Sequence, residues 1–203
     1  SSLLECMEER QVTVDGKTHL LPIPFFVMAT QNPIELEGTF PLPEAQLDRF
    51  LLKTRLGYPD RQEEIQILER FQQADPLQEL LPVATPEDVS RLQQDRRNII
   101  VSGPVREYVT DIVRATRNHT AIQFGASPRG SLGLMRAGQA LAALRGREYI
   151  LPDDIKSLVC PVLAHRLILK EEDRLRGEDP EHILESLIHG IPVPAATGST
   201  NGS

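Results

Sequence analysis

The chain has 203 residues, enough to bury a core as one large domain or as two small ones. Hydrophobic residues make up 40% and charged residues 25% of the sequence, which is ordinary for a soluble protein. Aromatic residues make up only 4% and the formal net charge is -7, so broad base stacking and a basic groove for nucleic acid or anionic lipid are both disfavoured. These values exclude a basic surface across the whole protein, but they allow a local cluster of arginines.

The spacing of the cysteines and histidines indicates no metal site. Cys6 and Cys160 form no C-x-x-C pair, and the five histidines show no HExxH spacing. No signal peptide is visible, and no apolar run approaches the roughly 20 residues that cross a bilayer, so we expect a cytoplasmic protein. The chain does not begin with Met, and we expect it to be the downstream part of a longer protein.

The beginning of the chain carries signals for β-structure. Residues 11–14 and 17–21 flank Asp15-Gly16, which predicts a β-hairpin because a type I′ turn needs positive φ at both central positions. Residues 25–30 form a continuous apolar run. Such a run predicts a strand covered on both faces, as in a parallel sheet between helices.

Helical signals dominate the rest of the chain. A short helix is expected over residues 44–50 and a further short strand over residues 51–56. Asp60 and Glu63 form a capping box that begins a helical stripe. Apolar residues at helical spacing predict later helices over residues 104–118, 128–145, 152–163 and 180–190.

The sequence therefore predicts a mainly α-helical chain in two parts. Residues 1–57 are expected to be the remnant of an α/β unit, and residues 58–190 an all-α domain of ordinary size. Residues 191–203 are small and polar toward their end, and we expect a disordered tail there.

Two candidate site residues lie in the first part. Asn32 follows the predicted strand, where ligands gather in open parallel sheets, and its amide can orient a water or bind a phosphate oxygen. Its alternative role is the turn that Asn-Pro often makes. Arg49 lies near the end of a short predicted helix, where it either interacts with the helix dipole or serves as an arginine finger on a γ-phosphate. Taken alone, each is explained by local structure.

Arg129 is the third candidate. Ser127-Pro128-Arg129-Gly130 predicts an N-cap, a first helical residue and then an arginine in the first turn. A cation there opposes the helix dipole, whereas an arginine beside free backbone N–H groups binds phosphate well. The alternative is that Arg129 pairs with an acidic neighbour on the helical bundle.

The sequence lacks the motifs that bind nucleotide phosphates directly. No G-x-x-x-x-G-K-[ST] stretch occurs, and Lys17 follows Gly16 only inside the predicted hairpin. No apolar strand ends in an Asp-Glu pair that could hold Mg²⁺.

Taken together, these segments resemble parts of the MoxR-type AAA+ ATPases. Residues 2–16 are similar to the stretch after the Walker B acids, and FVMATQNP at residues 26–33 resembles the sensor 1 strand. EGTFPLPEAQLDRF at residues 37–50 resembles the arginine-finger segment, and Ser127-Pro128-Arg129-Gly130 resembles sensor 2. The resemblance covers roughly residues 2–190.

This resemblance implies the downstream part of a P-loop AAA+ core followed by a helical lid domain. The parent would be a ring ATPase, expected to be a hexamer, that uses ATP and Mg²⁺ for chaperone-like remodelling or for metal or cofactor loading of an unidentified client protein. Asn32 would contact nucleotide and position the attacking water, Arg49 would act in trans, and Arg129 would contact the γ-phosphate in cis. Because the Walker A and B regions are absent, we expect that the chain alone neither binds ATP tightly nor hydrolyses it.

Two other functions remain open at the level of sequence. The chain could be a non-enzymatic helical module whose Arg129 end recognises an anionic or protein partner. The same AAA+ parts could also belong to a DNA-directed machine, which the net acidity disfavours. A phosphate-binding loop roughly 100 residues before Ser1 would favour the ATPase over the binding module.

Overall fold

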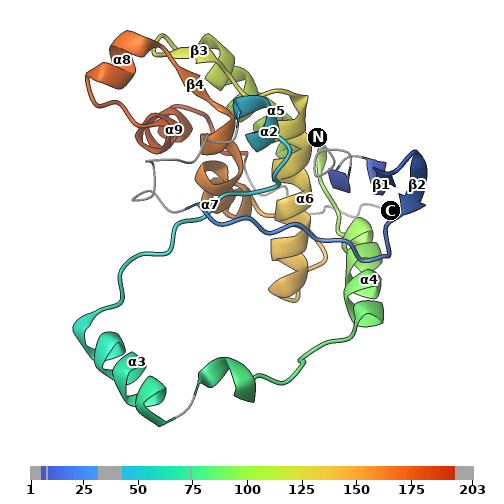
Figure 1. Cartoon of the computed structure of the whole chain (residues 1–203). Helices are drawn as coiled ribbons and strands as arrows, with labels where there is room; N and C mark the ends of the chain where they lie inside the picture. Colours follow the sequence, from blue (N-terminus) through green and yellow to red (C-terminus); the bar gives the residue numbers. More distant parts are fainter. Residues whose placement is uncertain (1–5, 8, 32–42, 74, 195–203) are drawn as a thin grey trace.

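A computed structural model describes residues 6–7, 9–31, 43–73 and 75–194 of the chain. Four helices form its body: α5 (Gly103–Asn118), α6 (Pro128–Leu144), α7 (Pro152–Leu163) and α9 (Pro180–His189). Figure 1 shows these helices gathered together, with the β1–β2 hairpin and the helix α3 lying away from them. The four helices match the predicted spans, because each begins with a proline in its first turn, as the sequence indicates.

The predicted hairpin is confirmed. Strands β1 (Gln11–Val14) and β2 (Lys17–Leu20) pair antiparallel, with Val14 opposite Lys17. At the turn Asp15 has φ 50° and Gly16 has φ 75°. Positive φ at both central positions is the geometry that the Asp-Gly pair predicted.

The predicted strand over residues 25–30 is wrong for the structure described here. The segment forms no strand, and the side chains of Phe26 and Met28 are 78% and 79% exposed. Among the described residues the only sheets are two-stranded, β1–β2 and β3–β4, so no neighbouring strand is available to this run. An apolar run becomes a buried strand only where another strand accepts its backbone hydrogen bonds.

The segment around α2 (Glu44–Leu47) also differs from expectation. The helix is shorter than the predicted span of residues 44–50, and residues 51–56 form no strand. This second prediction is also wrong, because the segment meets the end of a helix rather than another strand. The Lys53 N–H donates to the Pro161 carbonyl at 2.8 Å.

The core of the body forms where the apolar stripes of its helices meet. Its largest fully buried side chains include Ile112 of α5, Leu134 of α6, Ile155 and Leu163 of α7, and Leu184 of α9. Between α5 and α6 the sequence forms β3 (Ile122–Phe124), which pairs antiparallel with β4 (Ile168–Leu169). This small sheet was not predicted, and it adds two short strands to an otherwise helical body. The short helix α8 (Glu171–Leu175) follows β4 and is largely exposed.

A long arm separates α2 from the body helices. It carries α3 (Arg61–Gln73), η1 (Pro76–Glu79), α4 (Pro86–Asp95) and η2 (Arg96–Asn98). The predicted capping box at the start of α3 is present, since the Glu63 N–H donates to Asp60 Oδ1 at 2.8 Å and the Asp60 N–H donates to Glu63 Oε2 at 2.9 Å. In Figure 1 α3 lies apart from the body. Its apolar residues Leu68 and Phe71 are exposed.

The arm returns to the body through a polar clamp on α6. The Arg96 guanidinium donates to Gln139 Oε1 at 3.0 Å, and Gln139 Nε2 donates to the Ile99 carbonyl at 2.9 Å. In the part of the chain that the structure describes, no helix is both long and apolar enough to cross a bilayer. A division of the chain near residue 57 remains a proposal, and residues 195–203 of the predicted tail lie outside the described residues.

Candidate functional site

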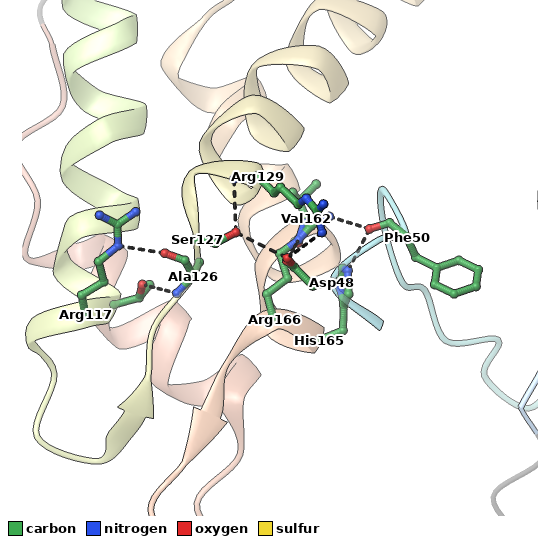
Figure 2. Close-up of polar contacts among 10 residues, drawn as sticks. Asp48, Phe50, Arg117, Ala126, Ser127, Arg129, Val162, His165 and Arg166 are labelled. Carbon is green, nitrogen blue, oxygen red and sulfur yellow. Dashed lines mark hydrogen bonds and ion pairs between the residues drawn. The ribbon is translucent and has the colours of Figure 1, made fainter. Parts of the chain in front are cut away.

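The carboxylate of Asp48 lies between two arginines that come from the helical body. Arg129 Nη1 lies 3.6 Å from Asp48 Oδ2, and Arg166 Nε lies 3.3 Å from Asp48 Oδ1. Figure 2 shows the three side chains converging where the turn after α2 meets the start of α6 and the η3 turn (Ala164–Arg166). Residues 48 and 166 are 118 positions apart in sequence, so only the tertiary fold brings them together.

The start of α6 is built as the sequence predicts. Ser127 is the N-cap, and its hydroxyl oxygen accepts a hydrogen bond from the Arg129 N–H at 3.2 Å. The same hydroxyl donates to Asp48 Oδ2 at 3.4 Å. The Asp48 carboxylate therefore offsets the unfavourable charge of Arg129 near the positive end of the helix dipole.

The loop before α6 is fixed to α5 by its backbone. The Ala126 N–H donates to Thr116 Oγ1 at 3.0 Å, and Arg117 Nε donates to the Ala126 carbonyl at 2.8 Å. At Gly125 an added Cβ would lie 2.7 Å from backbone atoms of Thr116 and Arg117. A side chain cannot fit there without moving backbone, so a glycine at this position allows the loop to approach α5 and aims the start of α6.

The first turn of α6 is also pressed against the end of α7. A Cβ added to Gly130 would lie 2.9 Å from Leu163 Cδ2 and 3.1 Å from the Ala126 Cβ. This close approach brings Arg129 near η3, where Arg166 lies. Two glycines thus help to set the position of Arg129: Gly125 through the approach to α5 and Gly130 through the approach to the end of α7.

Arg166 is a buried arginine that the sequence analysis did not single out. Its side chain is only 3% exposed. It donates through Nη1 to the Val162 carbonyl at 3.1 Å and through Nη2 to the Phe50 carbonyl. Burial lowers the pKa of the guanidinium, and the Asp48 carboxylate opposes that change. The sequence signal for Arg166 was an arginine between the apolar segments of α7 and β4. An arginine that is buried there requires a carboxylate or carbonyl partner.

His165 holds the same backbone carbonyl as Arg166. Its Nε2 lies 3.1 Å from the Phe50 oxygen, and because a carbonyl only accepts, Nε2 carries the proton. Burial lowers the pKa of the imidazole, and the positive charge of the neighbouring Arg166 lowers it further by a smaller amount, so the ring is neutral at physiological pH. The buried Nδ1 has no hydrogen-bond partner among the described residues.

Arg49 lies in the turn between Asp48 and Phe50, both of which are held by the body. Its backbone N–H donates to the Gln46 carbonyl at 3.3 Å, and its side chain is half-buried. The fastening of the residues on either side of Arg49 fixes where its backbone lies. The role of its side chain remains a prediction.

The structure brings two of the three predicted site residues into one region. Arg129 and Arg49 are linked through Asp48, which pairs with the first and precedes the second. The alternative from sequence assumed that Arg129 pairs with an acidic residue on the helical bundle. Arg129 does pair with an acidic residue, but that residue, Asp48, belongs to the segment around α2. Asn32 lies outside the described residues.

The two arginines differ in what they can do. The side chain of Arg129 is 52% exposed, and such an ion pair contributes about 0–1 kcal/mol, so an added anion competes for this guanidinium. Arg166 is buried, and each of its three guanidinium nitrogens has a hydrogen-bond partner, so this residue holds the segment after α2 against the body. The described residues contain no group of three or more side chains suited to a metal ion.

Two protein-family models match the chain. The model described as the AAA lid domain matches residues 114–187, and the model described as the ATPase family associated with various cellular activities (AAA) matches residues 1–52. The first match includes the start of α6 with Arg129, and the second includes Asp48 and Arg49.

Individual proteins are also similar to this chain over almost its whole length. The uncharacterized protein YeaC of Bacillus subtilis is 48% identical over 194 residues, which covers 96% of this chain and 61% of the relative. The chaperone MoxR1 of Mycobacterium tuberculosis is 40% identical over 203 residues, which covers 96% of this chain and 53% of the relative. The chain thus spans little more than half of the length of these relatives.

A solved structure has the same fold. The crystal structure of a candidate ATPase from Cytophaga hutchinsonii matches with a TM-score of 0.88 at 35% sequence identity. The match covers 95% of this chain and 61% of that chain.

Proposed function

This chain belongs to the MoxR-type AAA+ ATPases, and from that premise we propose that it carries the nucleotide-sensing arginines and the lid of a ring ATPase. Residues 1–57 form the downstream part of the α/β core in this proposal, and residues 58–190 form the lid. ATP with Mg²⁺ is the cofactor of the whole protein. Its phosphates are held by a loop that these 203 residues do not contain, since no G-x-x-x-x-G-K-[ST] stretch occurs in them.

The observation that carries the proposal is the position of Arg129. It lies half-exposed in the first turn of α6, beside backbone N–H groups and paired with Asp48 at the long distance of 3.6 Å. That combination suits a guanidinium that contacts the γ-phosphate of ATP in cis. Arg49 supplies the finger that acts on the ATP of the neighbouring subunit, and Asn32 positions the attacking water.

The assembled protein is a ring, expected to be a hexamer, with ATP at each interface between subunits. A trans-acting Arg49 requires the head-to-tail interface of a ring. Hydrolysis drives chaperone-like remodelling of a client protein, or the loading of a metal or cofactor into it. The chaperone name carried by MoxR1 supports a protein client. A cytoplasmic location stays a prediction.

ATP binding and turnover test this function. The phosphate-binding loop and the Mg²⁺ ligands supply most of the affinity and charge neutralisation in P-loop enzymes. We therefore expect the 203-residue chain to show no micromolar binding of labelled ATP and no hydrolysis. A longer protein that includes such a loop and has the length of the relatives is expected to do both. Micromolar ATP binding by the 203-residue chain, or an inactive longer protein, would contradict the proposal.

A further inference from the structure

Asp48 serves two arginines whose surroundings are very different. Its Oδ1 faces Arg166 Nε, in a side chain that is 3% exposed, and its Oδ2 faces Arg129 Nη1, in a side chain that is 52% exposed. The carboxylate itself is only 24% exposed. One carboxylate thus joins a buried cation to a cation at the surface.

These two contacts differ in how readily they break. Loss of a buried ion pair leaves an uncompensated charge in a poorly solvated place, which is strongly unfavourable. The contact with Arg129 is longer, at 3.6 Å, and its guanidinium is half-exposed, so this contact contributes less and weakens further with salt. An incoming phosphate would therefore displace Asp48 from Arg129 but not from Arg166.

Arg166 fastens more than the carboxylate. Together with His165 it holds the Phe50 carbonyl, so the residues on both sides of Arg49 are tied to η3. Lys53 adds a backbone hydrogen bond to the end of α7. The segment over residues 48–53 therefore moves with the helical body.

We propose that Asp48 is a positioning residue that fastens the Arg49 segment to the body through Arg166 and releases Arg129 to phosphate when nucleotide binds. This inference rests on the proposed function, in which Arg129 contacts the γ-phosphate and Arg49 acts in trans. It adds a carboxylate that couples the two arginines. The trans-acting segment stays in place while the cis-acting guanidinium changes partner.

The fastening is tested in the 203-residue chain by hydrogen exchange. Asp48→Asn and Arg166→Gln are expected to speed exchange of the Phe50 and Lys53 amides by about tenfold, while amides in the centre of α5 and α6 keep their rates. Asp111→Asn and Arg114→Gln change the same residue types at exposed positions of α5, and they should leave residues 48–53 unaffected. Unchanged exchange at Phe50 and Lys53 in Asp48→Asn would overturn the fastening, and this variant decides the question even if Arg166→Gln does not fold.

The release of Arg129 is tested by binding of a non-hydrolysable ATP analogue with Mg²⁺ to the longer protein. Because Asp48 competes with phosphate for Arg129, Asp48→Asn should tighten binding by roughly two- to fivefold. A merely structural loss would weaken binding or leave it unchanged. In an Arg129→Ala background the same substitution should have no effect.

The outcomes separate this inference from the proposed function. Tightening that persists without Arg129 would show simple charge repulsion between Asp48 and phosphate, and would overturn the release. Weaker binding by Asp48→Asn in the presence of Arg129 would overturn it as well. If the longer wild-type protein does not bind the analogue, the proposed function fails, and with it the release, while the exchange experiment still decides the fastening.

Discussion

The pKa of His165 is set by the surroundings of its ring in the fold. Its neutral ring donates from Nε2 to the Phe50 carbonyl, and burial lowers the pKa of the imidazole below its usual value. The positive charges of Arg166 and Lys53 lower the pKa further, whereas the Phe50 carbonyl and the Asp48 carboxylate raise it. The net direction is downward because desolvation is the largest contribution.

This shift predicts a loss of stability in mild acid. The unfolded chain takes up the proton near the ordinary histidine pKa of about 6.5, before the folded chain does, so the free energy of unfolding falls as pH drops below that value. The fall ends when pH passes the lower pKa of the folded protein. Urea unfolding between neutral and mildly acidic pH measures the effect.

The matched variant for this experiment is His165→Gln. A glutamine amide can donate to the Phe50 carbonyl but does not titrate, so its stability should depend less on pH than that of the wild type. Equal pH dependence in both proteins would contradict the assignment of the effect to His165.

At the scale of elements, the loop between β3 and α6 determines where Arg129 lies. A Cβ at Gly125 would lie 2.7 Å from three backbone atoms of α5, none of which can rotate away. We expect Gly125→Ala to displace the start of α6 and to lower the free energy of unfolding by about 1–3 kcal/mol. Chemical denaturation checks the stability. Hydrogen exchange at the Ala126 amide, which donates to Thr116, checks the displacement.

A second glycine provides the control for this prediction. Gly57 lies in the exposed segment before α3, and a Cβ added there would meet no atom within 4 Å outside its chain neighbours. Gly57→Ala should therefore be neutral or slightly stabilising, since alanine loses less backbone entropy on folding. Equal stability of the Gly125→Ala variant and the wild type would contradict the account of the loop.

Elements with local signals were predictable and elements that depend on distant partners were not. Helices α5, α6, α7 and α9 carry proline starts and helical apolar stripes, and the Asp15-Gly16 turn defines its hairpin within a few residues. The strand predicted over residues 25–30 failed because its pairing partner would have to come from another part of a sheet. The β3–β4 pair was missed for the same reason, since its strands are short and lie far apart in sequence.

The candidate site shows the same limit. Ser127 and Pro128 predict the start of α6, so the position of Arg129 in the first turn of this helix followed from local sequence. The pairing of Asp48 with Arg129 and Arg166 could not be predicted, because no periodicity links segments so far apart in sequence. Burial of Arg166 became evident only once α7 and η3 were packed against the segment after α2.

At the scale of the whole molecule, the chain carries two arginines that are proposed to act on two different nucleotides. In this proposal Arg129 acts on the ATP of its own subunit and Arg49 on the ATP of the next subunit, and the Asp48 carboxylate, which pairs with Arg129, directly precedes Arg49. The body that holds them is well packed, whereas the arm carries the exposed apolar residues Leu68 and Phe71.

The central proposal is that Arg129 acts in cis and Arg49 acts in trans, and one mixing experiment tests it. Arg49→Ala and Arg129→Ala variants of the longer protein are assayed for ATP hydrolysis alone and after subunits have exchanged in an equal mixture. Each variant alone should be strongly impaired, by about a thousandfold for Arg49→Ala. In random mixed rings about a quarter of the interfaces pair an intact Arg129 with a neighbour's intact Arg49, so activity should recover to about a quarter of the wild-type value. No recovery in rings shown to be mixed, or full activity in either single variant, would contradict the account.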